Sequence, residues 1–325
     1  MSMRSIALLL AAVLAAAFAP SGTARPPAAE PRQVPLVAAE HEAAGAAPEA
    51  TVPQVTRTAR AVTAKLDPLR PYRGLATWVD IYDELPWERP VVAVERMHRQ
   101  GVTTLFVETA NFGLDRPIFR PRRLARMIDA AHARDIQVVA WYLPSFANRA
   151  KDYRRSMAAI RFTTPSGEGF DGFALDIESD KVRDLAVRNA RLDALSRRIR
   201  RTVGKHYVLG AIVPEAGAKY WLNFPYRTVD RHYDVFLPMA YYTFRTSGAA
   251  RVDGWIRRNI RAIRTGTGDG STPIHIIGGL SMDTSVPELR AFADAAVAKR
   301  VTGASLYEFE TTTARQWRVL RRLRR

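Results

Sequence analysis

Two carboxylates stand two residues apart in the apolar segment FDGFALDIES, which covers residues 170–179. The side chains of a β-strand alternate between its two faces, so Asp176 and Glu178 share one face. Leu175 and Ile177 then share the opposite face. Two like charges this close make each other's ionisation more costly, and one of the two carboxyls keeps its proton near neutral pH. A held proton beside a carboxylate is what glycosidic bond cleavage requires, whereas a structural pair would be tied to arginines or backbone amides.

Eight short apolar segments with strand-like composition alternate with helical segments from residue 71 onward. They cover residues 73–82, 103–110, 137–146, 172–179, 207–216, 234–244, 274–281 and 303–310. The segments between them place apolar residues at helical spacing, as Leu124, Ile128 and Ala131 do, although Pro225 makes the one between the fifth and sixth strands irregular. Eight strand–helix units over roughly 255 residues predict an α/β fold, a closed (β/α)8 TIM barrel. An open doubly wound sheet is the competing architecture, but its usual glycine-rich turn after the first strand is missing.

The first 70 residues have the features of a targeting segment and a linker. Arg4 precedes an apolar run over residues 6–18, which is shorter than the roughly 20 residues that cross a bilayer. Small residues lead up to Ala24, so residues 1–24 predict a signal peptide and a secreted or cell-envelope-associated mature protein; an uncleaved membrane anchor is the alternative. Residues 25–70 are rich in Ala, Pro and Glu and predict a disordered linker before a catalytic domain over residues 71–325.

Acidic and aromatic residues gather at the expected carboxyl ends of the strands, where the active site of such a barrel lies. Acids follow at least six of the eight strands. Aromatic rings such as Trp78 and Trp87 can stack on the apolar face of a sugar ring, although any one of them can equally well close the core. The candidate substrate-binding residues at these ends are Asp80, Glu108, Trp141, Tyr142, Glu215, Tyr242, Tyr307 and Glu308.

The fourth strand resembles a known signature. The stretch DGFALDIE resembles the pattern DGxDxDxE of the family 18 glycoside hydrolases, the chitinase-like barrels. Asp171 and Gly172 match its opening, and Asp176 matches its last Asp. Glu178 matches the Glu that acts as the acid in that family, while Ala174 replaces the middle Asp. The Asp-x-Glu pair is also similar to that of the family 25 lysozymes.

Two further strands carry weaker resemblances. On the sixth strand MAYY resembles the family's M-x-Y-D: Met239 and Tyr241 match, and Tyr242 replaces the Asp. On the eighth strand Tyr307 resembles the Trp that forms the floor of the family's sugar site. Met239 therefore joins the candidate substrate-binding residues.

The resemblance implies a substrate-assisted mechanism. Glu178 would protonate the leaving oxygen, the substrate's 2-acetamido oxygen would attack, and Asp176 would orient that group, with Tyr241 hydrogen-bonding its oxygen. The residues by themselves also allow an ordinary two-carboxylate hydrolase. In that case Glu178 is the acid/base and its partner is Glu215, Glu308 or Glu108, about 5–5.5 Å away in a retaining enzyme or 6.5–9.5 Å in an inverting one.

A secreted hydrolase of a polysaccharide, N-acetylated or derived from the cell wall, is the leading hypothesis. A non-catalytic carbohydrate-binding barrel derived from such an enzyme is the rival. Ala174 and Tyr242 favour the rival, and the retained pair of Asp176 and Glu178 favours the enzyme. The chain has no cysteine, which excludes disulfides and thiolate metal sites, and no pattern predicts a metal or a cofactor.

The net charge of +17 favours polyanionic partners. The last twelve residues contain six arginines and no acid, at positions 315, 318, 321, 322, 324 and 325. They predict a basic helix with Leu320 and Leu323 packed inward, which would bind an anionic envelope surface; an ordinary solvated helix face is the alternative. We expect a carbohydrate polymer as the partner and a monomeric protein. We expect no nucleic acid as a partner, because an acidic mouth would repel its phosphates.

Overall fold

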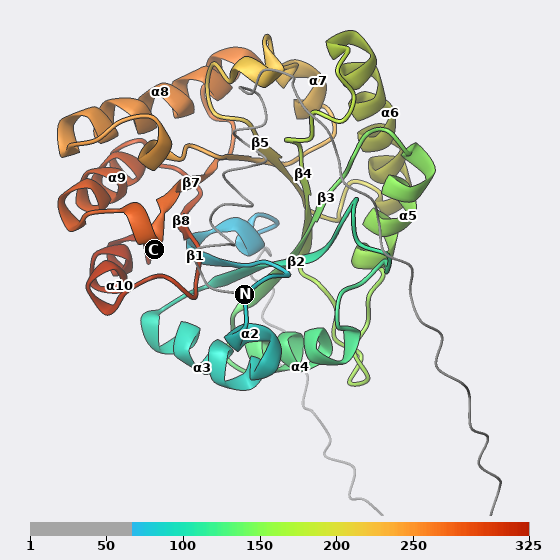
Figure 1. The fold of residues 1–325 in the computed structure, drawn as a ribbon, viewed down its shortest axis with the longest axis horizontal. Coiled ribbons are helices and arrows are strands. Elements are labelled where there is room, and N and C mark those ends of the chain that lie inside the picture. The colour runs from blue at the N-terminus through green and yellow to red at the C-terminus, as the bar shows by residue number, and fades with distance from the viewer. Residues whose placement is uncertain (1–66, 325) are drawn as a thin grey trace, which may run out of the picture. The chain divides into compact units, whose positions relative to one another are not determined.

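The computed structural model describes residues 67–324, which form a parallel eight-stranded sheet surrounded by helices (Figure 1). The strands are β1 (Gly74–Val79), β2 (Thr104–Asn111), β3 (Gln137–Leu143), β4 (Gly172–Asp176), β5 (Leu209–Val213), β6 (Val235–Pro238), β7 (His275–Leu280) and β8 (Gly303–Tyr307). Their order in the sheet is β6-β5-β4-β3-β2-β1-β8-β7, and isolated parallel bridges join Phe236 to Ile274 and Met239 to Ile277. The sheet is therefore a nearly closed barrel, which confirms the predicted fold. The predicted signal peptide and residues 25–66 of the predicted linker lie outside the described residues.

Helices connect successive strands and cover the outside of the barrel (Figure 1). They are α2 (Leu85–Glu88), α3 (Pro90–Gln100), α4 (Pro121–His132), α5 (Arg149–Ile160), α6 (Leu185–Val203), α7 (Tyr226–Asp230), α8 (Ala249–Thr267), α9 (Val286–Ala298) and α10 (Ala314–Leu320). Short 3-10 turns are η1 (Arg70–Tyr72), η2 (Lys219–Trp221), η3 (Tyr242–Phe244), η4 (Ser281–Asp283) and η5 (Arg321–Leu323). The helix between β5 and β6 is only five residues long, and it follows Pro225 as the irregular pattern there predicts.

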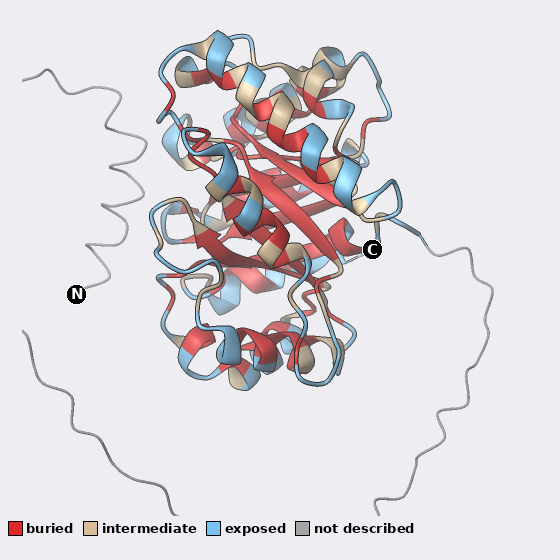
Figure 2. Cartoon of the chain, turned by 90° about the vertical axis from the view of Figure 1, so that its right-hand side faces the viewer, coloured by how far each residue is buried: buried red, intermediate tan, exposed pale blue. Residues whose placement is uncertain are grey.

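The strands separate two layers of buried side chains. One layer lies between the sheet and the helices and holds alternate strand residues such as Leu175 and Ile177. The other fills the barrel, where Trp78 stacks on Phe106 with ring centroids 4.2 Å apart. Figure 2 shows the same division, with strands buried throughout and helices exposed on their outer faces. Because side chains fill the barrel, its interior is not a channel, and the active site of such a barrel lies at the carboxyl ends of its strands.

The amino-terminal end of the barrel is closed by Tyr72 from η1. Its hydroxyl donates to the carbonyl of Phe173 at 2.9 Å. Gly210 faces this ring, and a Cβ placed on it would come within 2.7 Å of Tyr72 Cε1. His275 Nδ1 lies 2.9 Å from the carbonyl oxygen of Tyr72, which can accept a hydrogen bond from it. Burial lowers the pKa of His275 to about 4. The opposite end of the barrel, at the carboxyl ends of the strands, is therefore the place to look for an active site.

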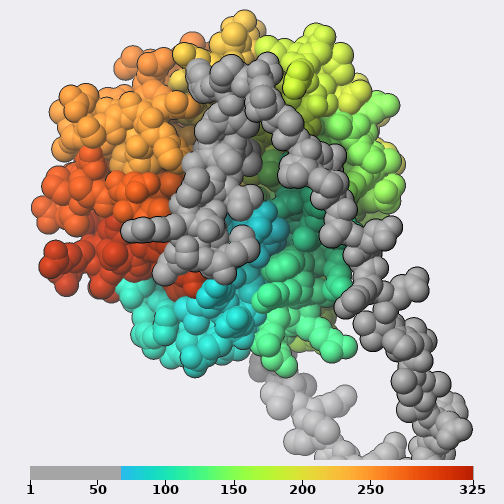
Figure 3. All heavy atoms as spheres, viewed as in Figure 1, coloured from blue at the N-terminus to red at the C-terminus, as the bar shows by residue number. Residues whose placement is uncertain are grey.

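The last unit of the chain lies beside the first, as the red and cyan surfaces of Figure 3 show. Helix α10 and turn η5 bury Leu320 and Leu323, as the sequence predicts. The arginines at 315, 318, 321, 322 and 324 are exposed, and Arg325 lies outside the described residues. Between residues 67 and 324, none of the helices has the length and apolar character that a bilayer crossing needs.

Candidate active site

The end of β4 brings the two carboxylates of the sequence motif into the mouth of the barrel. Asp176 is the last residue of the strand and is 6% exposed, while Glu178 follows in a turn and is partly exposed. Asp176 Oδ1 is buried and has no hydrogen-bond partner among the described residues. Burial, and then the charge of Glu178, raises the pKa of Asp176 well above its usual value. Burial, and then the charge of Glu215, raises the pKa of Glu178 to about 7, so this carboxyl can hold a proton near neutral pH.

Glu108 on β2 is a third carboxyl in the same mouth. It is 3% exposed, and its oxygens accept from Ile81 N at 3.2 Å and from Asn111 Nδ2 at 3.1 Å. Burial and the nearby Asp80 raise its pKa to about 8, so it is protonated at neutral pH. Strand register places Glu108 opposite Trp141, and Trp141 opposite Ala174. Glu108 therefore lies at the level of the barrel where the resembled motif would have its middle acid.

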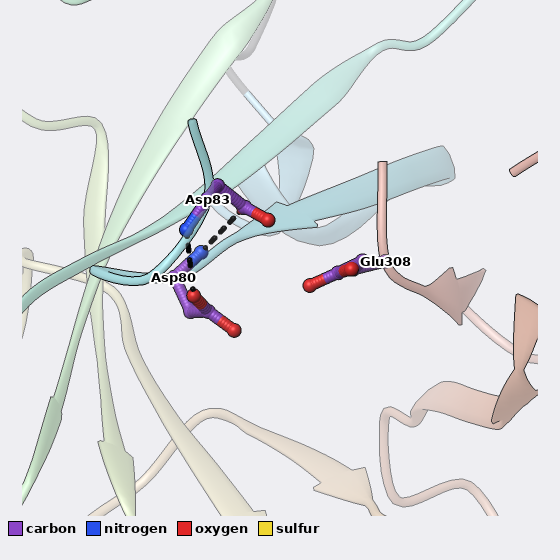
Figure 4. A group of neighbouring side chains, drawn as sticks. All are labelled: Asp80, Asp83 and Glu308. Carbon is purple, nitrogen blue, oxygen red and sulfur yellow. Dashed lines mark hydrogen bonds between the residues drawn. The ribbon is translucent and has the colours of Figure 1, made fainter. Parts of the chain in front are cut away.

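Asp80, Asp83 and Glu308 form a second acidic group, from the ends of β1 and β8 (Figure 4). Each offers one oxygen, and these oxygens lie within 4.8 Å of one another. Asp80 Oδ1 accepts from the backbone of Tyr82 at 2.7 Å, and Asp83 Oδ2 accepts from Asp80 N at 2.9 Å. Burial raises the pKa of Glu308 to about 8 and that of Asp83 well above its usual value. Such a group can share protons, and oxygen ligands of this kind also suit a hard divalent cation.

Aromatic rings form the floor between the two acidic groups. The Tyr307 hydroxyl donates to Asp80 Oδ2 at 2.5 Å, and the ring centroids of Tyr241 and Tyr307 are 6.1 Å apart. Trp141 meets Trp78 edge to face at 6.1 Å, and its Nε1 is buried without a hydrogen-bond partner in the described chain. Burial keeps the pKa of Tyr241 and of Tyr307 well above the usual value, so both phenols remain hydrogen-bond donors. Flat rings with free polar edges suit a sugar.

Glu215, in the loop after β5, lies beside this mouth and pairs with Arg245. The Glu215 side chain is 9% exposed and that of Arg245 is 43% exposed. Sequence reasoning missed Arg245, because no local pattern links a loop arginine to an acid 30 residues away. It also left Asp83 outside the candidate set, although the D-x-x-D spacing with Asp80 is typical of such a turn.

Two candidate residues are corrected by the structure. Tyr142 is fully buried in the layer beneath the helices, and its hydroxyl donates to Asp152 at 2.7 Å. Tyr242 lies in the same layer, and its hydroxyl donates to Thr284 Oγ1 at 3.2 Å. Tyr142 follows the inward-facing Trp141 on β3, so strand alternation turns it outward, whereas Tyr242 begins the turn η3 after β6 has ended. Neither side chain lies in the mouth, where the sequence analysis placed both.

Two other residues at the strand ends have structural contacts. Met239 is 6% exposed and bridges to Ile277 where β6 meets β7, so it packs under the mouth. Trp87 is buried, packs edge to face on Phe119, and donates from Nε1 to the Asp80 carbonyl at 2.6 Å. Trp87 thus holds the β1 end in place, outside the aromatic floor formed by Tyr241, Tyr307 and Trp141.

Solved glycoside hydrolases share this fold. The endo-beta-1,4-mannanase from Thermotoga petrophila aligns with a TM-score of 0.57 and 9% identity, over 73% of this chain and 68% of that chain. A chitinase from Bacteroides thetaiotaomicron aligns with a TM-score of 0.57 and 11% identity, over 78% and 96%. The spore cortex-lytic enzyme SleL of Bacillus cereus aligns with a TM-score of 0.56 and 8% identity, over 78% and 74%. Identities this low establish the barrel fold alone.

Neither a scan against protein-family models nor a search of curated proteins finds a match for the chain.

Proposed function

We propose that the chain is a glycoside hydrolase whose general acid is Glu178. The observation that carries the proposal is the pair at the end of β4, where Glu178 has a pKa of about 7 beside the buried Asp176. A general acid is most effective when its pKa lies near the working pH, so Glu178 can protonate the leaving glycosidic oxygen. The fold shared with chitinases and a mannanase supports this class of reaction. The substrate is a polysaccharide, N-acetylated or derived from the cell wall.

Two groups could attack the anomeric carbon. In the first route the substrate's 2-acetamido oxygen attacks, Asp176 orients the acetamido group, and Tyr241 donates a hydrogen bond to its oxygen. Tyr241 suits this role because it lies among the mouth acids, and their charges add to burial in raising its pKa.

In the second route the attacking group is a carboxylate of the protein. Glu215 is the first candidate, because its ion pair with Arg245 holds a charged carboxylate close enough to raise the pKa of Glu178. Glu108 and Glu308 are weaker candidates, because pKa values of about 8 leave both protonated at neutral pH. A protonated carboxyl is a poor nucleophile.

The rival proposal is a barrel that binds sugar without cutting it. The buried Tyr242 supports it, since the position that carries an Asp in the resembled motif here packs under the helices. Ala174 supports it as well, although Glu108 places an acid at the same level. Oligosaccharide binding in the mouth by a wild-type protein that releases no product would favour this rival.

We also propose that the mature protein is secreted after cleavage of residues 1–24 and acts as a monomer at the cell envelope. The exposed arginines of α10 and η5 would hold it on an anionic surface, and no nucleic acid is expected as a partner.

The test is Glu178→Gln, assayed against a panel of aryl glycosides and cell-wall fractions. Loss of a general acid should lower kcat by about 10²- to 10⁴-fold with little change in thermal stability. The matched control is Glu95→Gln, which removes a carboxylate from the outer face of α3 and should leave turnover unchanged. Normal rates in Glu178→Gln would exclude Glu178 as the acid.

A further inference from the structure

Two cavities flank Tyr153 on the outer wall formed by α5 and α6, which lie side by side at the right of Figure 1. One has a volume of about 620 Å³ and is lined by Tyr153, Arg154 and Arg161 among others. The other has a volume of about 530 Å³ and is lined by Arg149, Tyr153 and Arg198 among others. Volumes of this size match those of small-molecule sites, and each is large enough for a sugar residue.

The four arginines around Tyr153 are exposed, and no acid is paired with any of them within residues 67–324. Within residues 67–324, none of the side chains of Arg149, Arg154, Arg161 and Arg198 donates a hydrogen bond or forms an ion pair. Among the described residues, no Asp or Glu lines the cavity beside Arg149, and Asp115 is the one acid that lines the cavity beside Arg154. This surface is therefore locally cationic.

The acid on α5 itself does not offset these charges. Asp152 is fully buried and accepts hydrogen bonds from the Tyr142 hydroxyl and the Phe146 backbone amide, so it faces the barrel. Some arginines elsewhere on the outer surface are paired, since Arg322 pairs with Asp294 and Arg257 pairs with Asp253. Others, such as Arg290, are exposed and have no side-chain hydrogen bond or ion pair within residues 67–324. On this face of α5 and α6 the unpaired arginines line two cavities, one on either side of Tyr153.

Part of the site is fixed before any ligand arrives. The Arg198 guanidinium lies 3.6 Å from the Tyr153 ring centroid, and the Tyr153 hydroxyl is 2.9 Å from Thr202 Oγ1. A guanidinium stacked on a ring keeps its planar fork of N–H donors free, and that fork fits the two oxygens of a carboxylate. Less side-chain entropy is lost on binding when the donor is already held in place.

We propose that these two cavities bind an acidic polysaccharide through carboxylates on neighbouring sugar residues. The pairs of arginines on either side of Tyr153 would each take one charged residue. A cavity, rather than a flat basic surface, favours a sugar ring that carries an anion over a thin linear polyanion. One of the two cavities begins at Arg149, the first residue of α5, which follows the loop after β3. It does not depend on the proposed hydrolysis.

The experiment measures binding of oligogalacturonate to the full chain by calorimetry at physiological salt. Replacing Arg149, Arg154, Arg161 and Arg198 with Gln should weaken binding at least tenfold. Arg154→Gln with Arg161→Gln, which alters no side-chain contact, should lose part of that affinity. The matched control replaces Arg96, Arg258, Arg261 and Arg290, which are exposed on α3, α8 and α9, and should bind as the wild type does.

Three results would overturn the proposal. Equal losses in the two four-fold variants would show that only net charge matters. Equal binding of the neutral galactan oligomer would show that the carboxylates are not recognised. Polyphosphate binding as tight as that of the oligogalacturonate, with the same dependence on the four arginines, would show a surface for linear polyanions with no preference for sugars. Thermal unfolding of each variant distinguishes lost contacts from lost structure.

Discussion

The mouth of the barrel and its outer wall have opposite chemistry. In the mouth, Asp80, Glu108 and Asp176 are at most 6% exposed, and burial raises the pKa of each. On the outer wall, most arginines point into water, and the chain carries a net charge of +17. The net charge therefore predicts which charged partners are attracted over long range. The chemistry of the mouth depends instead on which of its closely spaced carboxyls are protonated.

The largest effect that would sharpen this contrast concerns Asp176. If the substrate's acetamido group is the nucleophile, Asp176→Asn should lower kcat by about 10²-fold or more on N-acetylated substrates, because the group that orients the acetamido is lost. A thiazoline analogue of the intermediate should also inhibit the wild type.

Comparable rates on substrates that lack the acetamido group would instead favour a protein nucleophile. Glu215→Gln is the matched variant, and under that mechanism it should abolish turnover of both kinds of substrate.

The next effect is on the pH profile. Glu178 acts as an acid only when protonated, so kcat/KM should be lost as the pH rises through about 7. Above that point the rate should fall about tenfold per pH unit. Arg245→Gln and wild type should be compared across pH 4–9, together with Glu215→Gln.

The charge of Glu215 raises the pKa of Glu178. If Glu215→Gln retains activity, its kcat/KM should therefore fall at a lower pH than that of the wild type. A profile that is flat from pH 5 to 9 in the wild type would contradict the role of Glu178.

The sequence predicts the inward and outward faces well where a strand is regular and poorly where it ends. Alternation places Asp176 inward and Ile177 outward, as the structure has them. The same rule excludes Tyr142 from the mouth once Trp141 faces inward, because two neighbours on a strand cannot share a face. The sequence also places more aromatic rings in the mouth than the structure does, because Tyr142, Tyr242 and Trp87 pack elsewhere.

The contacts between loops could not be predicted from one sequence. Glu215 and Arg245 follow β5 and β6, and the pairing of these two strands brings them together. Asp83 and Glu308 lie at opposite ends of the chain and meet because β1 pairs with β8. Each of these pairs depends on strand order, which a local pattern does not contain.

A smaller effect is expected on stability. The pKa of Glu308 rises from 4.5 to about 8 because of burial and the neighbouring Asp80. The folded protein holds this proton more tightly than the unfolded chain, so stability falls as the pH rises from about 4.5 through about 8.

Glu308→Gln should therefore stabilise the barrel by roughly 1–2 kcal/mol at pH 9 and by little at pH 4, after allowance for the partial exposure of the side chain. Chemical denaturation at both pH values measures the difference, with Glu95→Gln as the surface control. An equal change at pH 4 and pH 9 would show that the effect has nothing to do with ionisation.

The smallest effect concerns the arginines after α10. Arg321 donates to Gln100 Oε1 at 2.9 Å, and Arg322 pairs with Asp294 at 3.3 Å with both side chains more than half exposed. Such exposed contacts contribute little to stability, so Arg321, Arg322, Arg324 and Arg325 can be replaced by Gln without unfolding the barrel. If these charges hold the protein on an anionic envelope, the four-fold variant should leave isolated envelope material at lower salt than the wild type.

Activity on a small soluble substrate should not change, because the mouth lies at the ends of the strands and charges more than about 8–10 Å apart are screened at physiological salt. Added salt should reproduce the effect of the substitutions on the wild type. The measurement is sedimentation with envelope material across a salt series, run beside the four-fold variant of α5 and α6. Identical salt curves for wild type and tail variant would leave these arginines as a solvated helix face, whereas a shift only in the α5–α6 variant would assign retention to the outer wall around Tyr153.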